Sequence, residues 1–133
     1  MILSDSSRYI LLLMYLSLMK NEVKNWEEIK IKVGLNEDNL PVDLKWSASA
    51  NSAQGVKDCK AFNLGIWDPV ENNSLSINLW TNSMTVDEMN MHYVRNLLNL
   101  TKSYVDATKN PLAQNMMKTF CQNLMEETNK LKS

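Results

Sequence analysis

Side chains that could do chemistry are few in this sequence. His92 is its single histidine, and its two cysteines, Cys59 and Cys121, form no C-x-x-C unit. Neither a G-x-S-x-G nucleophile elbow nor a glycine-rich phosphate loop is present. A zinc or iron site would need a denser set of histidines and cysteines. We therefore expect no catalytic residue, no metal site and no bound cofactor.

Three pairs of neighbouring acids are the remaining candidates for general acid and base work. They are Glu37–Asp38, Asp87–Glu88 and Glu126–Glu127. We interpret the first as a turn, the second as a helix cap and the third as a solvated helix end. We also interpret His92 as non-catalytic, because a helical position beside Tyr93 indicates a surface or boundary residue rather than a base. A non-enzymatic protein is the expectation.

Length and composition describe one ordinary globular domain. The chain has 133 residues, of which 44% are hydrophobic and 22% charged, enough for a core without metal or disulfide support. Its net charge of −1 provides no field that favours nucleic acid or anionic lipid. Two free thiols are favoured over a disulfide.

The longest apolar run, from Tyr9 to Met19, lies near the N-terminus. It is shorter than the roughly 20 apolar residues of a membrane-spanning helix, and no small-residue cleavage site follows it. Three interpretations stay open: a mis-assigned start, an inefficient signal or anchor, and a packed helix. We expect an extension over residues 1–18, a start codon at Met14 or Met19 being the favoured explanation, and a single domain over 19–133. A cytoplasmic location is expected, and periplasmic or membrane-associated placement stays open.

Alternating apolar and polar residues predict four strands. The first hairpin comprises residues 27–35 and 41–48, and the second comprises residues 61–68 and 74–81. The small, polar residues 47–55 between the hairpins indicate an irregular connection, and residues 56–60 a short helical turn.

A helical period follows the last strand. Thr85 and Glu88 have the spacing of a capping box, and Asn110 with Pro111 marks the start of a second helix. Each helix has an apolar stripe that we expect to be buried. On the first helix it is Val86, Met89, Tyr93, Leu97, Leu100 and Tyr104; on the second it is Leu112, Met116, Phe120, Leu124 and Leu131.

Strands followed by helices predict an α+β fold. We expect one four-stranded antiparallel sheet of two hairpins, followed by two long C-terminal helices packed on one face of that sheet, the aliphatic one. On this arrangement Trp67 and Trp80 would lie on the open face. Exposed aromatic rings mark contact surfaces, so Trp67, Asp68 and Trp80 form the candidate protein-contact surface. The alternative is that the N-terminal segment, a loop or an oligomer partner covers the rings.

Residues 61–90 carry a resemblance to a known family. The residues concerned are Trp67-Asp68, then Leu79-Trp80-Thr81, then Met84-Thr85-Val86-Asp87-Glu88-Met89. This succession resembles the gliding motility protein GldC family of Bacteroidetes, over about residues 27 to 130. One departure is the stretch before Met19, which does not match the short polar leader of the family and so strengthens the interpretation of a mis-assigned start.

The resemblance implies a small accessory protein of surface gliding, associated with the gliding lipoprotein B, without enzymatic activity or cofactor. We therefore expect a non-enzymatic protein-binding module that supports assembly or efficiency of the gliding machinery. Its expected partner is a gliding lipoprotein or another gliding component; no nucleic acid and no stable membrane insertion are expected. The alternative is a homo-oligomeric chaperone or scaffold, because the export chaperone SecB has the same order of elements, an analogy of fold alone. An enzyme of unknown type is the third hypothesis.

Overall fold

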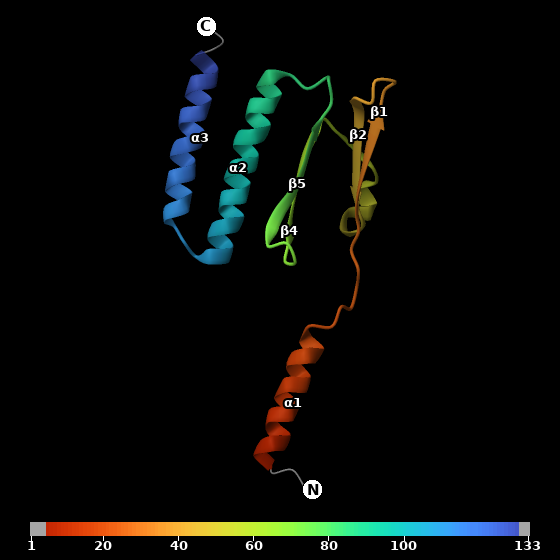
Figure 1. Ribbon diagram of the computed structural model, residues 1–133, viewed down its shortest axis with the longest axis vertical. Helices are drawn as coiled ribbons and strands as arrows, with labels where there is room; N and C mark the ends of the chain where they lie inside the picture. The colour runs from red at the N-terminus through yellow and green to blue at the C-terminus, as the bar shows by residue number, and fades with distance from the viewer. Residues whose placement is uncertain (1–4, 131–133) are drawn as a thin grey trace. The chain divides into compact units, whose positions relative to one another are not determined.

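The structure is a computed structural model that describes residues 5–130 (Figure 1). Its elements are α1 (Asp5–Lys20), β1 (Ile29–Leu35), β2 (Pro41–Ala48), the 3-10 helix η1 (Ser49–Gln54), β3 (Lys57–Cys59), β4 (Ala61–Asp68), β5 (Asn73–Trp80), α2 (Val86–Thr108) and α3 (Leu112–Lys130). The chain divides into two compact units. One contains Met1–Ile31 and Trp46–Lys57, and the other contains Lys32–Lys45 and Asp58–Ser133.

In the first unit, α1 carries the long apolar run. Its described leucines, tyrosines and isoleucine are all exposed. Among the helices that the structure describes, none combines the length and apolarity needed to cross a membrane. Elsewhere in this unit the amide of Ser49 donates to the Glu28 carbonyl at 2.9 Å, and the Glu28 amide donates to Ser49 Oγ at 2.7 Å. This reciprocal pair fixes the start of η1 beside the start of β1.

The α+β class and the antiparallel β4–β5 pair are confirmed, but the single four-stranded sheet is wrong. The strands form a three-stranded sheet in the order β1-β2-β3 and a separate two-stranded sheet, β4-β5. Residues 57–59, expected within a helical turn, are a strand. The chain bends at Lys60, so it belongs to one sheet before that residue and to the other after it.

The placement of the helices on the aliphatic face is also wrong. In β4–β5 the helix α2 contacts the opposite face, through Asn63: His92 Nε2 lies 2.6 Å and Asn96 Nδ2 3.1 Å from Asn63 Oδ1. The reason is polar matching. The Asn63 amide oxygen, although Asn63 is exposed, bonds to His92 and Asn96, one helical turn apart, and the aliphatic face offers α2 no such polar partner.

Helix α3 packs against α2, on the side of α2 away from the β4–β5 hairpin (Figure 1). Val94 and Thr101 of α2 and Cys121 of α3 are buried at this contact, with Cys121 Sγ 3.9 Å from the Val94 carbonyl oxygen. The predicted stripe on α3 is confirmed at Leu124 and wrong by about one position before it; Leu131 lies outside the described residues. Leu112, Met116 and Phe120 are exposed, and the half-buried positions are Ala113, Met117, Leu124 and Thr128.

Both helix starts are confirmed. The Glu88 amide donates to Thr85 Oγ1 at 3.2 Å and the Glu88 carboxylate accepts the Thr85 amide at 2.9 Å, which completes the capping box. At the second helix the Leu112 amide donates to Asn110 Oδ1 at 3.2 Å. Helix α2 ends at Lys109, whose φ of 58° is left-handed and whose amide donates to the Val105 carbonyl at 2.8 Å.

Candidate functional site

The β4–β5 hairpin has two chemically different faces. Its register pairs Ala61 with Trp80 and Asp68 with Asn73, and successive side chains alternate between faces. The aliphatic face consists of Phe62, Leu64, Ile66, Leu75, Ile77 and Leu79. The tryptophan face consists of Ala61, Asn63, Gly65, Trp67, Ser74, Ser76, Asn78 and Trp80.

Trp67 and Trp80 share the tryptophan face but are not brought together. Trp67 lies opposite Ser74 at the turn end of the hairpin, and Trp80 lies opposite Ala61 at the other end. Six residue steps at about 3.3 Å each put the two positions roughly 20 Å apart. Trp67 is 60% exposed and Trp80 53% exposed. The two rings are therefore separate rather than one patch, and the prediction of an open face is wrong, because they lie on the face that α2 contacts.

Asp68, the third predicted contact residue, closes the hairpin turn. Its Oδ1 accepts the amides of Val70 at 2.8 Å and Glu71 at 3.2 Å. A short acidic side chain that accepts amides two and three residues on is a standard turn-forming arrangement, and Asn72 completes the turn with a left-handed φ of 51°. The local bonds of Asp68 thus give it a structural role.

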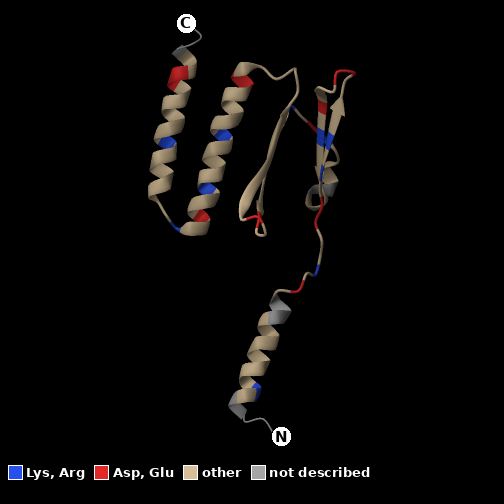
Figure 2. Cartoon of the chain, viewed as in Figure 1, with Lys and Arg blue, Asp and Glu red and all other residues tan. Residues whose placement is uncertain are grey.

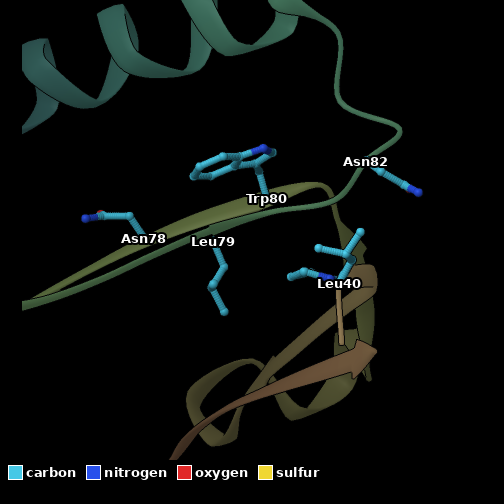
Figure 3. A pocket seen from close by; sticks show the side chains of 6 residues that line it. Leu40, Asn78, Leu79, Trp80 and Asn82 are labelled. Atoms are coloured by element: carbon cyan, nitrogen blue, oxygen red, sulfur yellow. The ribbon is translucent and has the colours of Figure 1, made fainter. Parts of the chain in front are cut away.

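Trp80 borders a cavity of about 250 Å³ at the edge of β5. The residues that line it are Leu40, Pro41, Asn78, Leu79, Trp80 and Asn82. Figure 3 shows the side chains of Asn78 and Trp80 on one side of the strand and Leu79 on the other, so the cavity lies along the backbone edge. The amide of Asn82 donates to the Pro41 carbonyl at 3.4 Å, which holds Leu40 beside this edge.

A network of amide and imidazole groups joins the tryptophan face to α2. Besides the contacts of Asn63 with His92 and Asn96, Asn63 Nδ2 donates to Asn78 Oδ1 at 2.7 Å. Asn96 Nδ2 lies 3.2 Å from His92 Nδ1. Asn96 Nδ2 also lies 3.1 Å from His92 Nε2, and a His92 that donates from Nε2 to Asn63 can accept at Nδ1. His92 is half-buried within this network, a boundary residue as its helical position predicted.

Beside this network lies a second cavity, of about 310 Å³, between the tryptophan face and α2. Its lining is Asn63, Leu64, Gly65, Ser76, Asn78, Tyr93, Asn96, Leu97 and Leu100. None of these side chains carries a formal charge at neutral pH. The cavity consequently suits apolar or amide groups better than phosphate or carboxylate groups.

Charge is confined to the ends of the hairpin. From Ala61 to Trp80 the only charged residues are Asp68 and Glu71, both near the turn, as Figure 2 shows. At the other end Lys60 Nζ contacts Glu88 Oε1 at 2.7 Å. Lys45 Nζ lies 2.6 Å from Asp58 Oδ1 and 3.3 Å from Asp43 Oδ2; hydrogen bonds to these carboxylates raise the pKa of Lys45.

Two observations concern metal binding and cysteine chemistry in residues 5–130. Within the part of the chain that the structure describes, no three His, Cys, Asp or Glu side chains gather where they could hold a metal ion. Burial raises the pKa of the Cys59 thiol, and the nearby Asp58 and Asp43 carboxylates raise it further. A thiol is nucleophilic as its thiolate, so this environment disfavours attack by Cys59.

The family described as gliding motility-associated protein GldC-like matches residues 41–130. The chain belongs to the GldC-like family. This membership associates it with gliding motility. No curated protein and no solved structure matches the chain.

Four of the eleven residues that carried the GldC-like resemblance have a structural role in the described contacts. Thr81 is 3% exposed, with its amide on the Lys60 carbonyl at 2.8 Å and its Oγ1 2.9 Å from Ser83 Oγ. Asp68 forms the turn, and Thr85 with Glu88 caps α2. Trp67 and Trp80 differ, because their rings stay more than half exposed.

Sequence reasoning missed the amide network and the two cavities. A usable signal existed for the network. His92 and Asn96 are four residues apart on a helix, and Asn63 and Asn78 are paired across the hairpin. Such matched polar spacings on two elements indicate a polar contact between them. No comparable signal places Leu40 beside Trp80, since that contact depends on the fold.

Proposed function

We propose that this GldC-like chain is a non-enzymatic, protein-binding accessory of the gliding machinery. The observation that carries the proposal is the exposure of Trp67 and Trp80, at 60% and 53%. Both belong to the residues that carried the family resemblance, a set in which Asp68, Thr81, Thr85 and Glu88 have structural roles. Aromatic rings are enriched at protein interfaces, where they bury a large area at low entropic cost.

The surroundings of the rings favour a protein partner. From Ala61 to Trp80 the hairpin is charged only at Asp68 and Glu71, near its turn. The cavity beside Trp80 has Leu40, Pro41 and Leu79 in its lining. An apolar cavity beside an exposed aromatic ring suits an apolar side chain of a partner protein. We propose a gliding lipoprotein or another component of the gliding machinery as the partner that supplies it.

The non-enzymatic part of the proposal has support of its own. The single histidine bonds to Asn63 and Asn96 through both ring nitrogens, and the Cys59 environment disfavours the thiolate. A general base needs a free lone pair within reach of a substrate. The described contacts of His92 use that lone pair for positioning.

Affinity capture from gliding cells tests the proposal. The tagged chain, Trp67→Ala and Trp80→Ala would be crosslinked in the cell, and captured proteins would be identified by mass spectrometry. Trp26→Ala is the matched control, because Trp26 is 88% exposed and lies outside residues 41–130. We expect a gliding component to be captured by the unchanged chain and Trp26→Ala, and at least tenfold less by one or both hairpin variants.

Equal capture by all four proteins would overturn the role of the rings, and capture of no gliding component would overturn the function. Suppression of aggregation of an unfolded client protein by the purified chain would favour the chaperone alternative instead.

A further inference from the structure

The backbone of β5 has an open edge. Thr81 donates its amide to the Lys60 carbonyl, so the pair Lys60–Thr81 is hydrogen-bonded, and bonded pairs alternate along an antiparallel ladder. Trp80, Asn78, Ser76 and Ser74 therefore direct their amides and carbonyls away from β4. In the described part of the chain, β4 is the only strand paired with β5.

One of these outward amides has a local partner. Ser74 donates to Asn73 Oδ1 at 2.8 Å. The outward amides of Ser76, Asn78 and Trp80 are those that could donate to the carbonyls of another strand.

Strand β5 has none of the features that keep strand edges apart. Proteins protect such edges with charged residues, proline or bulges. The sequence Asn73–Trp80, NSLSINLW, contains no charge, no proline and no glycine. Its aliphatic residues Leu75 and Ile77 are 53% and 50% exposed. The edge is thus open in its hydrogen bonds, with Leu40 and Pro41 lining the cavity beside its Trp80 end.

The sequence of β5 is also nearly symmetric about Ile77. On either side of Ile77 stand Ser76 and Asn78, which are both polar, and then Leu75 and Leu79, which are identical. Antiparallel pairing of two copies about a two-fold axis at Ile77 would set Leu75 opposite Leu79 of the second copy. Ser76 would lie opposite Asn78 of that copy. Every aliphatic side chain would then stay on one face and every polar one on the other.

This register uses the open backbone groups. The pairs Ser76 with Asn78 and Ser74 with Trp80 are the outward ones, so they become the paired residues of the new ladder. With three outward amides in each copy, about six bonds form in all. Ile77 meets its own copy in a non-hydrogen-bonded pair, where side chains lie closest. A two-fold axis requires that self-complementarity.

We propose that two copies of this chain associate through β5, forming a continuous sheet in the order β4-β5-β5-β4. The second copy is the occupant that the observations favour, because the near-symmetry of β5 serves only a partner with the same sequence. No like charges meet across the axis, since β5 has none. The aliphatic faces of the two hairpins join into one surface of four strands. The proposal goes beyond partner binding through the tryptophan rings and stands without it.

Proline substitution tests whether the two copies associate through the outer edge of β5 rather than through that of β4. In Ser76→Pro the lost amide is one that points away from β4, so the β4–β5 ladder is retained while the central bonds of the dimer are lost. The matched control is Gly65→Pro, because Gly65 is paired with Ser76 across the ladder and its amide points to the other edge. A Cβ at Gly65 would meet no atom within 4 Å. Circular dichroism would verify that both variants fold.

Sedimentation velocity from 2 to 200 µM measures the outcome. We expect a concentration-dependent dimer for the unchanged chain and for Gly65→Pro, and a monomer for Ser76→Pro. A monomer throughout this range for the unchanged chain would overturn the proposal, as would an equal dimer fraction in Ser76→Pro.

Disulfide trapping tests the register without relying on proline. Ile77→Cys, in a Cys59→Ser background, places two thiols beside each other at the axis. The control Leu75→Cys places its two thiols roughly 13 Å apart, and the native Cys121 is buried. Mild oxidation should give a crosslinked dimer with Ile77→Cys at least fivefold more than with Leu75→Cys. Equal crosslinking of the two, or none with Ile77→Cys, would overturn this register.

Discussion

The Glu88 carboxylate joins Lys60 to the N-terminus of α2. Glu88 Oε1 accepts from Lys60 Nζ at 2.7 Å, and Oε2 accepts the Thr85 amide at 2.9 Å. Lys60 is the residue at which the chain bends between β3 and β4. One side chain therefore stabilises the cap of a helix and ties that helix to the junction between the two sheets.

Because of these bonds, the stability of the chain should fall at acid pH. They lower the pKa of Glu88 below the ordinary carboxyl value of 4.5, the Lys60 contact being the largest cause and the Thr85 amide the next. A group whose pKa is lowered by folding contributes stability above its unfolded value and loses it as the pH falls through the folded value. The contribution of the Glu88 charge is thus present above pH 4.5 and lost below it.

Glu88→Gln isolates that charge, because glutamine still suits the third position of a capping box. We expect urea unfolding to show Glu88→Gln less stable than the unchanged chain at pH 7, with the difference shrinking at pH 3.5. In Lys60→Met, carboxyl titration by NMR should show the pKa of Glu88 moved back toward 4.5. A difference in stability that is the same at both pH values would contradict the assignment.

The Thr85 hydroxyl is the other half of the cap. Thr85→Ala should destabilise the chain by about 1 kcal/mol, since an orphan amide of the first helical turn loses its acceptor. Thr85→Ser keeps the hydroxyl and should stay within about 0.5 kcal/mol of the unchanged chain. Chemical unfolding followed by helical circular dichroism measures both. Equal losses in the two variants would mean that the methyl group, not the hydroxyl, matters.

Local signals in the sequence predicted local structure well. The spacing of Thr85 and Glu88 identified the start of α2, Asn110 identified the start of α3, and the alternation in residues 61–68 gave β4 to the residue. These features are set by groups a few residues apart, so their physics is contained in a short window.

Features that depend on distant residues were not predictable in the same way. The alternation of apolar and polar residues showed that the β4–β5 hairpin has an aliphatic face, but it did not show which face α2 would contact. That choice depends on Asn63, His92 and Asn96, which are brought together by the fold. The extra strand at residues 57–59 was missed for the same reason, because a three-residue strand is defined by its neighbour rather than by its own sequence.

Side-chain truncation to alanine can test which face of α3 packs against α2. Phe120 is the large residue of the predicted stripe and is 53% exposed, whereas Val94, which Cys121 contacts, is 5% exposed. Val94→Ala should cost about 2 kcal/mol, from lost burial and a small cavity. Phe120→Ala should stay within about 0.5 kcal/mol, as surface substitutions do. If Phe120 were in the core, as the predicted stripe requires, its truncation would cost roughly 3–5 kcal/mol. Thermal unfolding of Phe120→Ala therefore distinguishes the predicted stripe from the observed contact.

Two substitutions test the structural role of Asp68 in the hairpin turn. Its Oδ1 accepts two turn amides, from Val70 and Glu71, so Asp68→Ala should destabilise the hairpin by about 1–2 kcal/mol. Asp68→Asn keeps an acceptor oxygen at the same place and should retain most of that stability. If Asp68 instead met a partner through its charge, the two variants would lose partner capture equally while differing in stability. Urea unfolding and affinity capture on the same pair of variants therefore distinguish a residue that shapes the turn beside Trp67 from one that binds.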